Sequence, residues 1–183
     1  MVRVTRNLLI LFAFILCGTP ALTFAKPNLE LNNEIQKATD TFKQEVKTGD
    51  SIISSAKGYL IFPEVTKAGI GIGGEYGKGA LVVDGEIKEY YSTKSASIGA
   101  QLGVQTKSMI IAFMTDEALE NFEKSNGWEV GVDGSVAIAK IGAEGSIDTT
   151  STLNKSVVAY IFGQSGLMAD VSISGSKISK LES

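Results

Sequence analysis

The most constraining feature of the chain is a glycine-rich stretch near its middle, where six glycines fall between residues 69 and 79. There, glycine alternates with Ile70 and Ile72, which is the two-residue period of a β-strand. Glycine weakens a strand, so this stripe indicates that a helix or a second sheet approaches the backbone closely. The predicted close-approach positions are Gly69, Gly71, Gly73, Gly74 and Gly77.

Three of these glycines also match the G-x-G-x-x-G spacing of dinucleotide-binding loops: Gly69, Gly71 and Gly74. Such a loop must open a helix whose N-terminus meets the pyrophosphate. The residues that follow, Glu-Tyr-Gly-Lys-Gly at 75–79, are a poor helix start. The context favours a structural role for the glycines.

Helical patterns lie on both sides of this region. A helix is predicted over residues 28–49 from apolar residues spaced by three or four, namely Leu31, Ile35, Ala38, Phe42 and Val46. A short second helix is expected at residues 52–57, with Asp50 or Ser51 as its N-cap. Thr115 and Asp116 are expected to cap a third helix that runs through Phe122.

The rest of the chain reads as strands. Asp84-Gly85 is a two-residue hairpin signal, and Pro63 is expected to end the first strand. The predicted strands cover residues 59–62, 68–74, 81–83, 87–91, 97–105, 108–114, 129–139, 142–147, 157–162 and 167–174, with a turn at 163–166. We expect an α+β fold, in which an antiparallel twisted sheet or partial β-barrel has the N-terminal helices and one mid-chain helix packed on it.

The first 25 residues have the layout of a secretory signal peptide. Arg3 and Arg6 precede a short apolar run, and a small-residue exit ends at Ala25. We expect cleavage near Ala25, a single domain over residues 26–183, and a periplasmic or secreted protein. A retained anchor helix and a lipoprotein attached through Cys17 are the less favoured alternatives.

The amino-acid composition restricts the kinds of catalytic and metal site that the chain can form. The chain has no histidine, and its one cysteine is Cys17. This removes the commonest general base and the ordinary zinc and copper sites. Carboxylate-only chemistry and oxygen-ligated calcium stay open, although the acids of the later strands and loops do not have the spacing of a calcium loop. We expect no enzymatic activity, no metal and no cofactor.

The charge balance argues against nucleic acid as a partner. The formal net charge is −3, and without residues 1–25, which carry two arginines and no acid, 15 basic and 20 acidic residues remain. Nucleic-acid binding needs a basic field, whereas a local group of lysines is enough to meet lipid phosphates. Basic and aromatic residues flank the glycine-rich stretch, and the predicted lipid-binding residues are Lys57, Tyr59, Lys67, Tyr76, Lys78 and Lys94. The alternative is that these lysines only solubilise the chain and the aromatic rings belong to the core.

Residues 56–81, AKGYLIFPEVTKAGIGIGGEYGKGAL, resemble the opening signature of the SYLF domain family. The resemblance continues at 97–105, 109–114 and 159–167. It implies phosphoinositide or phospholipid binding in eukaryotic relatives, some of which also bind actin, and lipid binding in exported bacterial members.

Residues and resemblance together predict a non-enzymatic module of the bacterial envelope that binds phospholipid or a membrane surface. The alternative is a structural or protein-interaction component of the envelope, with an envelope protein as its partner.

Overall fold

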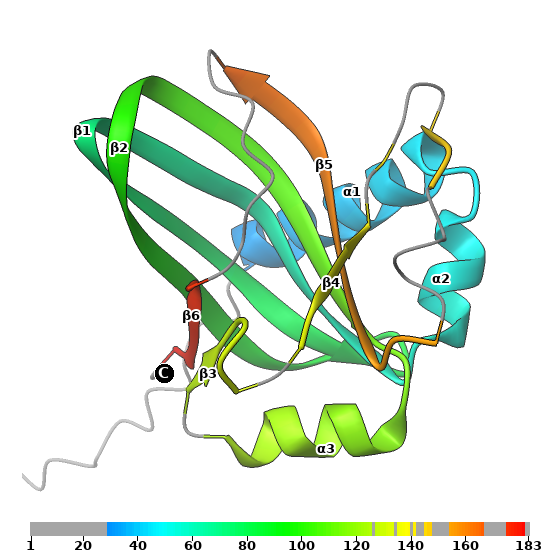
Figure 1. The fold of residues 1–183 in the computed structure, drawn as a ribbon. Helices are drawn as coiled ribbons and strands as arrows, with labels where there is room; N and C mark the ends of the chain where they lie inside the picture. The colour runs from blue at the N-terminus through cyan, green and yellow to red at the C-terminus, as the bar shows by residue number, and fades with distance from the viewer. Residues whose placement is uncertain are drawn as a thin grey trace, which may run out of the picture.

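The structure is a computed structural model that describes residues 29–125, 127–133, 135–139, 141, 145–147, 154–166 and 175–181, with the backbone alone for residues 97–102. Its helices are α1 (Leu29–Glu45), α2 (Gly49–Ser55) and α3 (Asp116–Lys124). Its strands are β1 (Gly58–Val83), β2 (Glu86–Phe113), β3 (Trp128–Glu129), β4 (Ala137–Ala139), β5 (Val157–Gly166) and β6 (Lys177–Lys180). The expected α+β fold is confirmed (Figure 1). The predicted signal peptide with Cys17 and the predicted strand at 167–174 lie outside the described residues.

Strands β1 and β2 form one long antiparallel hairpin. It runs from Gly58 opposite Phe113 to Val83 opposite Glu86. Asp84 and Gly85 make the predicted turn, with φ values of 53° and 78°. These left-handed values suit a two-residue turn between twisted strands.

The hairpin is bent in its middle, so that its two halves become the two layers of a curled half-barrel (Figure 1). The register shifts between Ile70 and Ile72, and Gly71 at this bend has a φ of 75°. In the first layer, which contains residues 58–70 and 102–113 of the hairpin, β5 pairs with β2. In the second layer, which contains residues 72–98, β6 pairs with β2. β4 pairs parallel to β5, so the sheet is mixed rather than wholly antiparallel.

Pro63 does not end the first strand, contrary to the prediction. The register shifts between Phe62 and Val65, and this irregularity accommodates a proline that has no N–H to offer the ladder. The segments predicted as separate strands at 68–74 and 97–105 are therefore the middle parts of β1 and β2.

Other predicted boundaries were also wrong. The described residues 145–147 of the strand expected over 142–147 form no strand, and Ile147 makes only an isolated bridge to Ile141. The strand expected over 129–139 is interrupted, because Gly131 has a φ of 92° and the Asp133 carboxylate accepts a hydrogen bond from the Glu129 N–H at 2.6 Å, which turns the chain. The turn expected at 163–166 is the last part of β5. Helix α2 begins at Gly49 rather than after Asp50 or Ser51.

The first half of β1 lies directly against its second half. A Cβ atom on Gly79 would collide with the Ile61 carbonyl oxygen, and one on Gly77 would lie 2.8 Å from the Glu64 carbonyl oxygen. The element that approaches these glycines is thus the same strand rather than a helix or a second sheet. This contact closes one side of the curl, and only residues without a side chain fit there.

The other glycines of the stripe have different surroundings. A Cβ on Gly69 would collide with Gly73 across the bend. For Gly71 no atom lies within 4 Å, and for Gly74 the nearest is the Ser95 carbonyl oxygen at 4.0 Å. Close approach of the backbone therefore explains why residues 69 and 77 are glycine. Residue 71 is glycine because the bend needs a positive φ there.

Two clusters of buried apolar side chains stabilise the packing of the sheet layers and helices. The inner cluster lies inside the curl and includes Leu60, Phe62 and Leu81 together with Phe122 of α3. The outer cluster lies between α1 and the convex face, and Phe42 of α1 is its fully buried centre. Its β1 residues come from both halves of that strand, so α1 covers the place where the first half of β1 lies against the second half.

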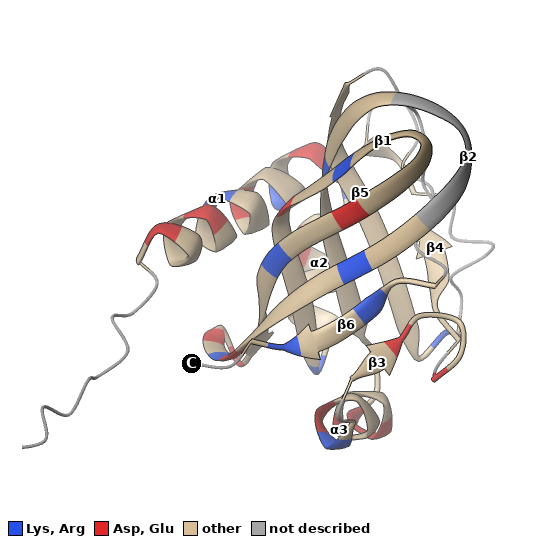
Figure 2. Ribbon diagram, turned by 90° about the vertical axis from the view of Figure 1, so that its left-hand side faces the viewer, with Lys and Arg blue, Asp and Glu red and all other residues tan. Residues whose placement is uncertain are grey.

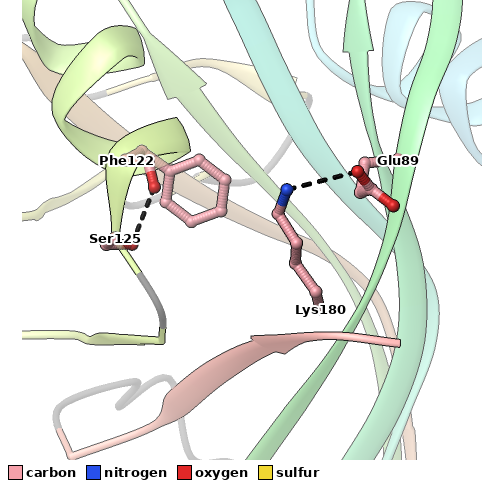
Figure 3. A network of polar contacts seen from close by, with 4 residues as sticks. All are labelled: Glu89, Phe122, Ser125 and Lys180. Atoms are coloured by element: carbon pink, nitrogen blue, oxygen red, sulfur yellow. Dashed lines mark hydrogen bonds and ion pairs between the residues drawn. The ribbon is translucent and has the colours of Figure 1, made fainter. Parts of the chain in front are cut away.

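Polar contacts fix the elements at the edge of the second layer (Figure 3). The Lys180 Nζ of β6 donates to the Glu89 carboxylate of β2 at 3.2 Å. The Ser125 hydroxyl donates to the Phe122 carbonyl oxygen at 2.7 Å and ends α3. β6 is thereby held beside β2, where Lys177 is opposite Lys94.

Candidate functional site

The bend of the hairpin carries an exposed apolar tip, formed by Ile70, Ile72 and Val104. Their side chains are 81%, 71% and 56% exposed. Of the six large apolar residues exposed in the described part of the chain, these three and Tyr76 belong to the bend region of β1 and β2. Single exposed apolar residues are common, but a group of them marks an interaction surface.

A strip of lysines lies beside the apolar tip on the outer face of the second layer. This lysine strip consists of Lys78, Lys94 and Lys177, from β1, β2 and β6. Lys94 is paired in register with Tyr76 on one side and Lys177 on the other. Figure 2 shows basic positions on these three neighbouring strands on the face turned to the viewer.

The lysine strip has no ion pair among the described residues, whereas most other described lysines do. The Lys94 Nζ lies 5.8 Å from the centre of the Tyr76 ring, a cation–π contact. Glu129 of β3 is opposite Lys177 in register, but no ion pair joins them. Like charges on directly opposite residues destabilise a sheet, so the Lys94–Lys177 pair favours a surface that meets an anion.

The structure separates the six residues predicted for lipid binding. It brings Tyr76, Lys78 and Lys94 together beside the tip. Lys57 lies next to the far end of the hairpin and pairs with Asp116 of α3 at 3.4 Å. Tyr59 and Lys67 are buried, so neither belongs to this exposed surface.

Each of the two buried residues has a physical explanation. Tyr59 packs in the outer cluster under α1, and burial raises the pKa of its hydroxyl. Lys67 follows the irregularity at Pro63. Phe62 and Val65 both face the inner cluster, although residues three positions apart in a regular strand would lie on opposite faces. The irregularity therefore reverses the side-chain alternation, and Lys67 turns inward.

Lys67 joins a second group of residues, inside the curl. This inner polar cluster consists of Lys67, Glu75, Thr93, Gln105 and Lys107, all of them buried. The Lys107 Nζ donates to Glu75 Oε2 at 3.0 Å, and their side chains are 2% and 4% exposed. The sequence patterns did not indicate this cluster, because Gln105 and Lys107 look like ordinary surface residues in an alternating strand.

Two grooves lie elsewhere. One of about 400 Å³ is bordered by α3 and residues 154–157, with Phe122 and Trp128 among its lining residues. A smaller one of about 240 Å³ lies between α1 and the irregularity at Pro63. Among the described residues, no three acidic, histidine or cysteine side chains are grouped so as to hold a metal ion. None of the described helices is both long and apolar enough to cross a membrane.

The fold and its surface thus define a curled, helix-covered α+β domain with an apolar tip beside a basic strip. Residues 94–183 match the sequence model of the family described as Ysc84, Las17-binding protein actin regulator, which is the SYLF domain family. This match over the second half of the chain agrees with the resemblance to the SYLF domain family in the sequence. No curated protein matched the chain.

Proposed function

We propose that the chain is a non-enzymatic module that binds the surface of a phospholipid membrane through the apolar tip and the lysine strip. The observation that carries the proposal is the exposure of Ile70 and Ile72, at 81% and 71%, beside lysines that have no acidic partner in the described residues. The resemblance of residues 56–81 to SYLF domains, which implies lipid binding, supports it.

The energetics suit a peripheral contact. Transfer of a fully exposed isoleucine out of water is worth about 1.5–3 kcal/mol, so two of them at the tip contribute several kcal/mol. Each lysine near an anionic surface adds about 1 kcal/mol. Tyr76, which is partly exposed between tip and strip, has the amphipathic ring that favours the boundary between hydrocarbon and headgroups.

The acidic balance of the whole chain does not oppose this contact. Electrostatic attraction at a distance of a few ångströms depends on nearby charges, because salt screens charges farther away than about 8–10 Å. On the lysine strip the local charge is positive. Export to the periplasm or the exterior, with a domain over residues 26–183, is the setting we propose, on the strength of the N-terminal sequence pattern.

Vesicle co-flotation tests the proposal. The wild-type protein is compared with the double variant Ile70→Ser/Ile72→Ser, using neutral and anionic phospholipid vesicles at low and high salt. We expect wild-type protein to float with anionic vesicles and the double variant to lose most of this binding. Val132→Ser is the matched control, because Val132 is equally exposed, at 73%, but lies in the turn after β3. Equal flotation of wild type and double variant would exclude the tip as the contact.

The family description names protein binding, and this favours a second candidate: a protein partner at the same tip. In that case neither the wild-type protein nor the variant floats with any vesicle. The flotation experiment therefore separates the two candidates.

A further inference from the structure

The interior of the curled hairpin changes from apolar to polar toward the bend. Near α3 it is filled by aromatic and aliphatic side chains such as Phe113, Phe122 and Trp128. Nearer the bend the inward-facing residues are those of the inner polar cluster, and both layers contribute to it. Thr93 and Glu75 come from the second layer, and Gln105 and Lys107 from the first.

Several atoms of this cluster have no partner. Thr93 Oγ1, Glu75 Oε1 and both amide atoms of Gln105 are buried without a hydrogen bond in the described part of the chain. Buried polar atoms are almost always hydrogen-bonded, because losing water without a replacement is costly. Four such atoms in one cluster indicate a site for something polar.

The inner polar cluster and the apolar tip include residues of the same strand, on either side of the bend. Lys67 and Glu75 each lie four residues from Gly71 at the bend, on opposite sides of it. At about 3.3 Å per residue this is roughly 13 Å along either half of the strand. If the tip enters the hydrocarbon edge as proposed above, the cluster lies at the level of the lipid headgroups.

The atoms present define the ligand chemistry. Lys107, the Gln105 amide N–H and the Thr93 hydroxyl are donors, which suit phosphate oxygens. Glu75 Oε1 and the Gln105 carbonyl oxygen are acceptors, which need a ligand group that donates. A phosphate ester that also carries an ammonium or hydroxyl group offers both.

We infer that the inner polar cluster binds one such phosphate-ester headgroup between the two layers of the hairpin. The inference deepens the proposed function and rests on it for a lipid as the source of the headgroup; a free phosphate ester has the same chemistry. Entry requires the layers to part at the bend, where β1 has two glycines, Gly71 and Gly74, at which an added Cβ would meet no atom closer than 4.0 Å.

Thermal unfolding with a soluble probe tests the site. The probe is glycerophosphoethanolamine, with glycerol and inorganic sulfate as controls that each lack one half of its chemistry. We expect the probe to raise the Tm of the full protein by about 3–6 °C at ten times its Kd. The controls should leave the Tm nearly unchanged.

Gln105→Leu separates binding from structure. It removes two unpartnered atoms at similar size, so it should raise the Tm of the protein without ligand while abolishing the shift caused by the probe. Thr93→Val, which removes one unpartnered hydroxyl, should reduce the shift. A purely structural glutamine would give the opposite result, a lower Tm for Gln105→Leu.

The outcomes also separate this inference from the proposed function. Ile70→Ser/Ile72→Ser should keep the probe-induced shift while losing vesicle flotation. The inference is overturned if the probe leaves the wild-type Tm unchanged, if sulfate alone reproduces the shift, or if Gln105→Leu retains it. If the Gln105→Leu protein floats like the wild type, and the probe shifts the Tm of neither protein, the inner site is excluded. The tip then remains as the membrane contact.

Discussion

The Nζ atom of Lys107 lies 3.0 Å from Oε2 of Glu75, and this buried ion pair joins the two layers of the bent hairpin. Lys107 is opposite Val65 in the first layer, and Glu75 is opposite Ser95 in the second. The pair therefore spans the interior of the curl rather than neighbouring strands.

Lys107→Met should destabilise the protein by about 3–5 kcal/mol, because it leaves the Glu75 carboxylate buried without its cation. Urea unfolding measures the loss. The double variant Glu75→Leu/Lys107→Met should recover more than half of it, since two apolar side chains replace the pair. If the double variant is as unstable as the single one, the two residues are not coupled across the layers.

Gly79→Ala should destabilise the protein by about 1–3 kcal/mol or more, because its Cβ would collide with the Ile61 carbonyl oxygen and lie 2.7 Å from the Phe62 ring. Gly74→Ala is the matched control in the same strand. Its Cβ meets nothing closer than the Ser95 carbonyl oxygen at 4.0 Å, so its effect should stay within about 0.5 kcal/mol. Equal effects at the two glycines would argue against closure of the curl by β1 itself.

Lys94→Gln and Lys177→Gln should each weaken binding to anionic vesicles about fivefold, the equivalent of about 1 kcal/mol per lysine. The triple variant that includes Lys78→Gln should lose most of the salt dependence. Lys124→Gln is the control, because Lys124 pairs with Glu120 on α3 at 2.8 Å. Unchanged salt dependence in the triple variant would exclude the lysine strip.

The same substitutions test the repulsion within the strip. Lys94 and Lys177 are paired in register on adjacent strands, so Lys177→Gln should leave stability unchanged or raise it by a few tenths of a kcal/mol. Thermal unfolding at low salt is the appropriate measurement. A clear loss of stability would indicate a structural role for Lys177 instead.

Stability should fall at alkaline pH through Tyr91. Burial, with smaller contributions from the Glu89 and Glu123 carboxylates, raises the pKa of the Tyr91 hydroxyl from 10.0 to about 12. Since the folded state holds the proton more tightly than the unfolded state, this stabilisation is complete below pH 10 and is lost as the pH rises from about 10 to about 12.

Tyr91→Phe isolates this effect, because it keeps the ring that packs on Phe122 and removes only the hydroxyl. Its unfolding free energy should depend less on pH above 10 than that of the wild type. Some dependence should remain, because burial also raises the pKa of Tyr59 and of Tyr160. Parallel curves for wild type and variant would contradict the assignment.

Part of the fold could be predicted because its causes are local. The apolar spacing of α1, the capping of α3 by Thr115, whose side chain accepts from the Ala118 N–H, and the Asp84-Gly85 turn all depend on residues a few positions apart. Tyr76 and Lys78 belong to the predicted lipid-binding set and lie two positions apart in the same strand. Lys177 was missed, because it reaches Lys94 only through the pairing of β6 with β2.

The sequence by itself determined the α+β class, the positions of α1, α2 and α3, the Asp84-Gly85 turn, the resemblance to the SYLF family and the residue types available for chemistry, since these depend on composition and short-range pattern. The tertiary structure decided which side chains are exposed. The irregularity at Pro63 reverses the alternation of β1 and turns Lys67 inward, and the bend at Gly71 exposes Ile70 and Ile72, which an alternating strand would be expected to bury. Both results follow from strand register, which is set by packing between residues far apart in the chain.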